Sequence, residues 1–206
     1  MKKILLAALP LLVLASCYPG GADYVEELDA VYTTYDDKYD FKSKSTYARP
    51  DKIVVDIEID DGDTTYIFMK DAFAKTVFEA IDKNMATLGW TRVDDIGDEP
   101  DLLLTPAAIK STTYFASYWY DWWYGGWYGG YWGWYYPPYY TISSYTTGSL
   151  IITMSDPNKG TESPIGQSPT NWVFVANGLY TGAYDISRVT RAIDDGYSQS
   201  PYLNTK

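Results

Sequence analysis

The sequence predicts an α+β protein in which two helices pack on one face of a mainly antiparallel sheet of about six strands. Short segments rich in β-branched and aromatic residues recur along the chain, as expected for strands that bury one face. Two longer segments repeat apolar residues at helical spacing. Because the strand-like segments follow one another mostly as hairpins, the order favours helices on one side of a sheet. A long aromatic-rich loop insertion interrupts this order.

Two strands are predicted before the first helix. Residues 28–35 are rich in β-branched and aromatic side chains, and residues 53–59 alternate apolar with acidic side chains. The polar residues 36–50 between them are predicted to be a connection. Asp and Gly at residues 60–63 predict a turn after the second strand. Whether residues 66–69 form a strand or begin the helix is left open by their pattern.

The first helix is predicted over residues 70–88. Asp71 is its predicted N-cap, and Gly89 is predicted to lie just beyond its C-terminal end. Apolar residues recur at intervals of three or four, so they share one side of the helix and form its predicted core-facing stripe. This stripe consists of Phe73, Val77, Ile81, Met85 and Leu88.

Four further strands and a second helix follow the first helix. The strands are predicted at residues 90–93, 102–109, 149–154 and 171–179. The two strands that flank the aromatic insertion are predicted to be neighbours in one sheet. Trp90 and Trp172 lie within predicted strands and are predicted core residues. The second helix is marked by Ile186, Val189, Ile193 and Tyr197, with Asp185 as its cap and Pro201 beyond its end.

The aromatic insertion is bounded at residues 111–146 and is densest at residues 114–140. Of these 27 residues, 17 are Phe, Trp or Tyr, and Asp121 is the only charged residue. Aromatic residues occupy every phase, and paired Gly and Pro residues predict loops or turns. Four roles stay open: a self-packed loop, a stacking platform for sugars, contact with the membrane interface, and contact with a protein. The predicted contact surface consists of Trp119, Trp122, Trp123, Trp127, Trp132 and Trp134.

The first 16 residues are predicted to be a lipoprotein signal peptide. Two lysines precede the apolar residues 4–14, which are too few to span a bilayer as a helix. The following L-A-S-C resembles the lipobox of bacterial lipoproteins, so Cys17 is the predicted lipidation site. Residues 17–25 then form a lipidated tether, and residues 26–206 form a single α+β domain.

The composition excludes several kinds of active site. The chain has no His, which rules out Ser-His-Asp and Cys-His catalysis and any His-ligated metal site. Loss of the two signal-peptide lysines takes the formal net charge from −11 to −13, which repels nucleic acid. Acidic residues at 60–63 and 94–95 lie in predicted turns, where Asp is favoured for local hydrogen bonding. We therefore predict no catalytic residue, metal site, cofactor or nucleic-acid partner.

Several short motifs along the mature chain carry a family resemblance. Besides the lipobox, they are V-Y-T-T-Y-D at 31–36, T-Y-A-R-P-D at 46–51, L-G-W at 88–90, P-D-L-L-L at 100–104, G-S-L-I-I-T-M at 148–154 and R-A-I at 191–193. With these motifs the chain resembles the bacterial envelope lipoprotein family catalogued as domain of unknown function 4136. Members from gut-type Bacteroidetes look similar even in the Tyr/Gly/Trp-rich insertion. The resemblance brings no established activity and no catalytic residues.

We expect a non-enzymatic lipoprotein of the bacterial cell envelope that acts as an interaction or assembly module. Residue 18 is not Asp, which by resemblance to enteric lipoproteins implies an outer-membrane location, facing the periplasm or the cell surface. The expected partners are the membrane, through the N-terminal lipid, and an envelope protein or a glycan. A glycan- or peptidoglycan-binding lipoprotein that uses the insertion is the alternative. A carboxylate-dependent hydrolase is a remote alternative.

Overall fold

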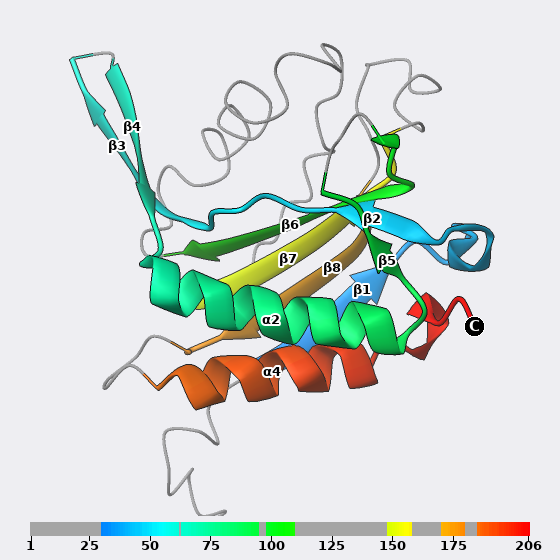
Figure 1. Ribbon diagram of the computed structural model, residues 1–206. Coiled ribbons are helices and arrows are strands. Elements are labelled where there is room, and N and C mark those ends of the chain that lie inside the picture. The colour runs from blue at the N-terminus through cyan, green and yellow to red at the C-terminus, as the bar shows by residue number, and fades with distance from the viewer. Residues whose placement is uncertain (1–29, 62, 95–97, 110–147, 158–169, 180–184) are drawn as a thin grey trace, which may run out of the picture.

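The computed structural model describes residues 30–61, 63–94, 98–109, 148–157, 170–179 and 185–206 (Figure 1). These residues form eight strands, two α-helices and two short 3-10 helices. The strands are β1 (Ala30–Tyr35), β2 (Thr46–Ala48), β3 (Val54–Asp60), β4 (Asp63–Phe68), β5 (Thr91–Arg92), β6 (Leu102–Ile109), β7 (Ser149–Ser155) and β8 (Thr170–Asn177). The helices are α2 (Asp71–Thr87) and α4 (Ile186–Ser198), and the 3-10 helices are Phe41–Ser43 and Pro201–Leu203.

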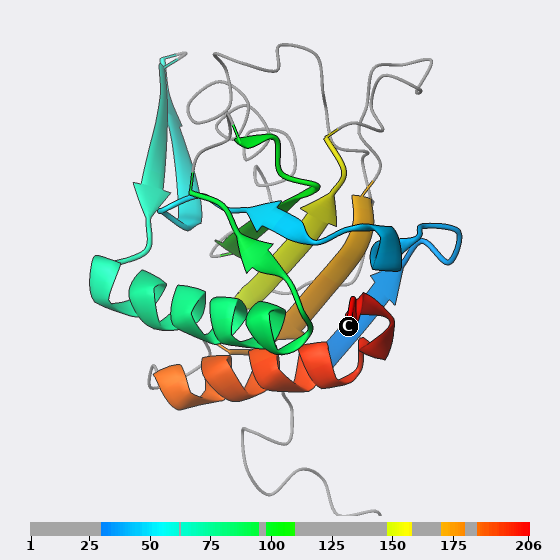
Figure 2. The same cartoon turned by 45° about the vertical axis from the view of Figure 1, so that its right-hand side comes forward.

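The predicted α+β class is confirmed, with both α-helices on one face of the sheet (Figures 1 and 2). The strand order is β1-β8-β7-β6-β2-β5, and the β3–β4 hairpin joins this sheet through β6. Pairing is antiparallel between β1 and β8, β8 and β7, β7 and β6, and β3 and β4. Pairing is parallel where β2 meets β5 and β6, and where β3 meets β6. The sheet is therefore mixed but mainly antiparallel.

The sequence predicted about six strands, and the described residues form eight. The hairpin strand β4 occupies Asp63–Phe68, so most of the segment left open before the helix is strand. The predicted connection over residues 36–50 was wrong in part, because it contains a 3-10 helix and β2. Only three residues long, β2 shows no readable alternation. Its place is fixed by pairing with β5 and β6 on its two sides, which is information from distant segments.

The core lies between the helices and the sheet. From the sheet, Trp172 and Phe174 of β8 are fully buried, and Val77, Ile81 and Met85 of α2 meet this side. The predicted core positions of Trp90 and Trp172 are confirmed. Both buried indole N–H groups donate hydrogen bonds, Trp90 Nε1 to the Leu203 carbonyl at 2.8 Å and Trp172 Nε1 to Ser200 Oγ at 3.0 Å. A buried indole therefore loses no hydrogen bond relative to water.

The helix ends agree with the sequence at three of four predicted positions, one of which is Pro201, beyond the end of α4 at Ser198. Asp185 caps α4, because its carboxylate accepts a hydrogen bond from the Ser187 amide at 2.8 Å. Gly89 follows α2 with a φ of +100°, a conformation that Gly adopts without strain. Asp71 was wrong as the N-cap, since Lys70 takes that position without a side-chain bond. As the first helical residue, Asp71 still places a negative charge near the helix N-terminus, where it is favourable.

Different segments of the chain adjoin the two ends of the sheet. Val31, Ala176, Leu150 and Ala108 form one row across β1, β8, β7 and β6. The start of β1, the end of β6 and the start of β7 therefore lie at one end of the sheet, which we call the root end. Ile109 and Ser149 pair there, which confirms that the strands flanking the insertion are neighbours. The opposite end, which we call the polar end, holds the end of β1 and the C-terminal segment, since the Tyr35 and Tyr202 rings stack at 3.6 Å.

Several predicted features lie outside the described residues. They are the signal peptide, Cys17, the tether up to residue 25, the insertion at 111–146 and its six tryptophans. Within the part of the chain that the structure describes, neither helix has the length and apolar character needed to cross a bilayer.

Candidate functional site

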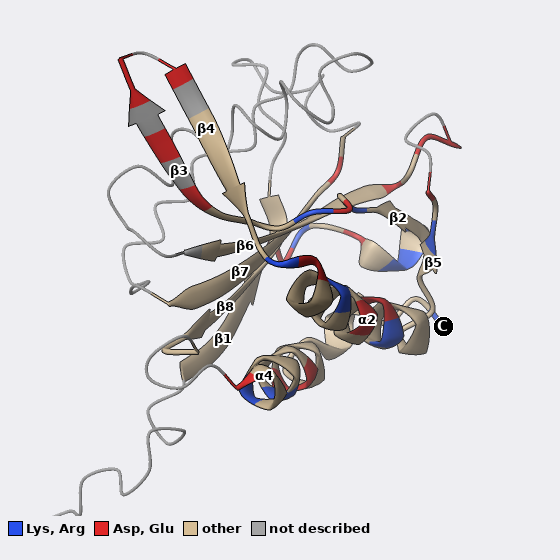
Figure 3. Cartoon of the chain, turned by 60° about the vertical axis from the view of Figure 1, so that its left-hand side comes forward, with Lys and Arg blue, Asp and Glu red and all other residues tan. Residues whose placement is uncertain are grey.

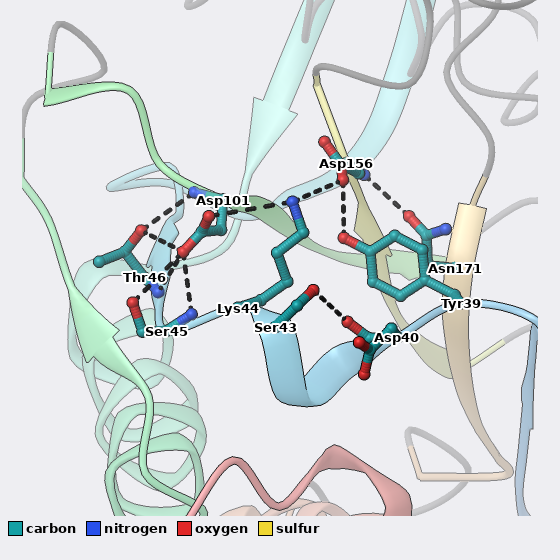
Figure 4. Close-up of polar contacts among 9 residues, drawn as sticks. All are labelled: Tyr39, Asp40, Ser43, Lys44, Ser45, Thr46, Asp101, Asp156 and Asn171. Carbon is teal, nitrogen blue, oxygen red and sulfur yellow. Dashed lines mark hydrogen bonds and ion pairs between the residues drawn. The ribbon is translucent and has the colours of Figure 1, made fainter.

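A buried carboxylate organises the polar end of the sheet. Asp156 follows β7, and its side chain is 1% exposed. Its Oδ2 accepts a hydrogen bond from the Tyr39 hydroxyl at 2.7 Å and lies 3.1 Å from Lys44 Nζ (Figure 4). The Asp156 amide donates to Asn171 Oδ1 at 2.8 Å, because β7 and β8 are neighbours. A buried charge requires such pairing to be tolerated.

Lys44 connects Asp156 to a second carboxylate at the start of β6. Lys44 Nζ lies 3.9 Å from Asp101 Oδ1. Asp101 Oδ2 accepts hydrogen bonds from the Ser45 amide at 2.9 Å and from the Thr46 amide and hydroxyl, both at 3.0 Å (Figure 4). Burial alone raises the pKa of Asp101, but the backbone hydrogen bonds outweigh it and hold the pKa below its usual value. We call Tyr39, Lys44, Asp101, Asp156 and Asn171 the Asp156 cluster.

The chemistry of the Asp156 cluster follows from the state of Tyr39. Burial, followed by the hydrogen bond to Asp156, raises the pKa of Tyr39 far above its usual value. Tyr39 therefore stays a neutral donor throughout the physiological range. A neutral phenol, one lysine and two carboxylates that already accept hydrogen bonds form a closed network. Its effect is to fasten the segment before β2 to the start of β6 and the end of β7.

A second cluster surrounds Asp82 on α2. Arg49 donates two hydrogen bonds to this carboxylate, from Nε to Oδ1 at 2.8 Å and from Nη2 to Oδ2 at 2.7 Å. The Tyr47 hydroxyl donates to Oδ1 at 2.8 Å, and Arg92 Nη1 donates to Oδ2 at 3.0 Å. The Arg49 guanidinium also lies 4.0 Å from the centre of the Phe78 ring, a cation–π distance. We call Tyr47, Arg49, Phe78, Asp82 and Arg92 the Asp82 cluster.

The electrostatics of the Asp82 cluster keep its carboxylate charged. Burial alone raises the pKa of Asp82, but the hydrogen bonds from Arg49 and Tyr47 outweigh burial and lower the pKa. Burial and the hydrogen bond to Asp82 raise the pKa of Tyr47 far above its usual value. The bidentate Arg49–Asp82 contact is the stronger form of charge-assisted bond. It fastens the chain just after β2 to α2.

An open cavity of about 460 Å³ lies beside the Asp82 cluster. It is bordered by the chain after β2 and by the first half of α2, and its lining carries four basic and four acidic side chains. The lining residues are Arg49, Asp51, Lys52, Met69, Asp71, Ala74, Lys75, Phe78, Glu79, Asp82 and Arg92. Its volume is within the range of small-molecule sites, but such sites are mostly apolar. Arg49 and Arg92 are both already bonded to Asp82.

Of the acidic residues noted in the sequence, those at the hairpin turn lie apart from both clusters, whereas Asp94 is bonded to Arg92 of the Asp82 cluster and Asp95 lies outside the described residues. Asp60, Asp61 and Asp63 are exposed at the tip of the β3–β4 hairpin (Figure 3). Asp61 has a φ of +46°, in keeping with the predicted turn. Asp94 accepts a hydrogen bond from Arg92 and is exposed. Over the described ranges, no three acidic or Cys side chains come together as a metal site would require.

The sequence reasoning missed the two clusters. Thr46, Tyr47 and Arg49 lie in the motif T-Y-A-R-P-D, and Asp101 lies in P-D-L-L-L, so two motifs behind the family resemblance contained this signal. The structure brings the two motifs together, because Asp101 binds the backbone at Thr46. Asp82 and Asp156 carried no local signal, since their partners lie far away in the sequence.

The fold and the two clusters define a class: a small α+β domain with two helices on one face of a mixed sheet and a short inner strand, β2, held by partly buried carboxylates. The chain belongs to the family described as domain of unknown function (DUF4136), whose model matches residues 31–202. It is similar to the crystal structure of a DUF4136 family protein from Bacteroides thetaiotaomicron VPI-5482, with 33% sequence identity and a TM-score of 0.64. That match covers 86% of this chain and 98% of the other.

The chain also has a distant match among solved structures. A PelC dodecamer from Paraburkholderia phytofirmans matches with 9% identity and a TM-score of 0.39, over 86% of this chain and 99% of the other. No curated protein matches the chain. The family is therefore known, and its activity is not assigned by these relatives.

Proposed function

We propose that this protein is a lipid-anchored lipoprotein of the bacterial outer membrane that acts, without enzymatic activity, as an interaction or assembly module. The observation that carries the proposal is the common origin of two segments at the root end of the sheet. β1 begins there, after the chain that leads from Cys17, and Ile109 and Ser149 pair there, where the aromatic insertion leaves and returns. The strands that flank the insertion are therefore paired at the end of the sheet at which β1 begins.

The distances involved support contact with the envelope. Three strand spacings separate β1 from β6, which is roughly 14 Å. The start of β1 and the end of β6, where the insertion begins, therefore lie within roughly 14 Å of each other. Trp and Tyr concentrate at membrane interfaces and at protein contacts, and one charge in 27 residues leaves the insertion well suited to either.

The anchor itself is a separate prediction. Cys17 is the only cysteine of the chain, and the signal-like segment ends at it. A diacylglycerol on its sulfur, with an acyl chain on the new N-terminus, gives the multiple-chain attachment that stable membrane binding requires. We expect wild-type protein to enter the detergent phase and the Cys17→Ser variant to stay in the aqueous phase. Equal partitioning of both variants into the aqueous phase would contradict the anchor.

The contact role of the insertion is tested by replacing its six tryptophans with Ser. We expect secretion and lipidation to persist while crosslinks to the envelope partner are lost, because apolar burial contributes about 25 cal/mol per Å². The matched control replaces the same six residues with Tyr and should keep most crosslinks. If the Ser variant retains every wild-type crosslink, the insertion is not a contact surface. Quenching of Trp fluorescence by soluble peptidoglycan fragments would identify a glycan as the partner.

A further inference from the structure

The face of the sheet opposite the helices carries a buried apolar cluster. Side chains alternate between faces along a strand, so these residues interleave with the core residues of the same strands. Ala107 of β6, Ile151 of β7, and Val173 and Val175 of β8 form one cluster with exposed fractions of 0 to 5%, and Tyr32 of β1 packs against it. We call these five residues the second face.

Neither described α-helix accounts for this burial. α2 and α4 pack against the other face, where Leu104, Ile152 and Phe174 belong to the main core (Figure 3). A sheet face exposed to water normally carries polar residues, whereas the second face carries Ala, Ile and Val. The second face therefore has the chemistry and the burial of a covered surface.

We propose that the chain's own aromatic segment, residues 110–147, covers the second face. The segment begins directly after β6 and ends just before β7, and these strands supply Ala107 and Ile151. Its 38 residues far exceed the roughly 25 Å length of the strands, at up to 3.3 Å or more per residue. Its aromatic composition and single acidic residue match an apolar surface. This inference does not rest on the lipid anchor or on an external partner.

One other segment outside the described residues, which connects β7 to β8, fits the second face poorly. Residues 158–169 leave from the polar end, between β7 and β8, and contain Ile165 as their only large apolar residue. Lys159, Glu162 and two prolines make that segment a poor cover for a surface built of Val and Ile. The aromatic segment is the occupant that both origin and composition favour.

The second face can bury only a minority of the aromatic side chains. Four strands of about this length present roughly 400 Å², from the strand spacing and the rise per residue. Each Phe, Tyr or Trp has about 150–250 Å² to bury. A few rings therefore fill the face, and most of the 17 aromatic residues in 114–140 stay available for other contacts. Docking on the second face is thus compatible with an outward contact surface.

Site-specific photocrosslinking in the full-length protein tests the proposal. Benzoylphenylalanine replaces Tyr32, which belongs to the second face, and in a matched control replaces Tyr35 of the same strand, which faces the helix side and stacks on Tyr202. We expect illumination to join position 32 to a peptide within residues 110–147, and position 35 to give no such product. Thr34, exposed on the same side as Tyr32, is a second placement if the first variant folds poorly.

Each other outcome overturns the proposal. A crosslink from position 32 to residues 158–169, to a second copy or to another protein would assign the face to a different occupant. If neither position 32 nor position 34 gives a crosslink, no segment covers the second face. As an independent measurement, replacing residues 114–140 with a Gly/Ser linker should increase binding of an apolar dye several-fold. Unchanged dye binding by the folded linker variant would also overturn the proposal.

Discussion

At the scale of single residues, Asp82 connects three elements. Its carboxylate receives hydrogen bonds from Tyr47 of β2, from Arg49 just after β2 and from Arg92 of β5. The Tyr47 side chain is almost fully buried, so its hydroxyl has no route to water once this acceptor is lost. The carboxylate therefore links β2 and β5 to α2.

Replacing Asp82 with Asn should lower the free energy of unfolding by about 2 kcal/mol, because charge-assisted bonds are lost and Arg49 is left without its counter-charge. Urea denaturation measures this change. The matched control is Glu79→Gln on the same helix, since Glu79 forms only an exposed pair with Lys75 at 3.8 Å. That control should change stability by no more than about 0.5 kcal/mol. Equal effects of the two substitutions would contradict the assigned role of Asp82.

Stability should also fall in acid. The pKa values of Asp82 and Asp101 are lowered in the folded protein, so the unfolded chain binds protons more readily at these positions. Their contribution is present above the ordinary Asp pKa of about 3.9 and is lost as pH falls through that value and below it. Urea midpoints at pH 7, 5, 4 and 3 give the profile. The double variant Asp82→Asn/Asp101→Asn should have a flatter profile, and an unchanged slope would refute the assignment.

At the scale of elements, α4 sits close to β8 because Gly196 has no side chain. A Cβ at this position would overlap the ring of Phe174, which is itself fully buried. We expect Gly196→Ala to destabilise the protein by about 1–2 kcal/mol, since overpacking outweighs the better helix propensity of Ala. Thermal unfolding measures the effect. Asp195→Ala, at the exposed neighbouring position, is the control and should be neutral or slightly stabilising.

The elements that the sequence predicted share a local signal. The apolar stripe of α2 and the Asp185 cap of α4 depend on neighbours within a few residues, so they could be read directly. β2 could not be predicted in this way, because three residues are too few to show a periodicity and its parallel partners lie far along the chain. The N-cap of α2 is Lys70, one residue before the predicted Asp71, and the preceding Met69 amide donates to the distant Ile53 carbonyl at 2.8 Å, a contact that the local sequence does not reveal.

The two polar clusters were hidden by the same limitation. Arg49 and Asp82 are separated by 33 residues, and Tyr39 and Asp156 by 117. Composition and periodicity contain no information about such pairs. The family motifs did mark Tyr47, Arg49 and Asp101, but only the fold shows that they hold β2 in place. Predictions about Cys17 and the six tryptophans stay predictions.

At the scale of the whole molecule, the aromatic insertion leaves the sheet between two paired residues. Because Ile109 and Ser149 are already paired, a short linker can close the same gap, and loop length changes the entropy of closure only slowly. A variant with residues 114–140 replaced by a short Gly/Ser linker should therefore keep cooperative unfolding, with some loss of stability from the uncovered second face. Circular dichroism during heating measures this. Loss of cooperative folding would show that the insertion is part of the core.

The pairing of β1 with β8 has a consequence for biosynthesis. The two strands are neighbours along their whole length, yet residues 36–169 separate them in the chain. A ribosome adds about 5–20 residues per second, so β1 waits on the order of ten seconds before its partner exists. Until β8 has been made, β1 has no native pairing partner, and this apolar, aromatic strand can pair with other chains. The only strand that β1 pairs with among the described residues is therefore made after most of the chain, so the sheet edge at β1 is completed last.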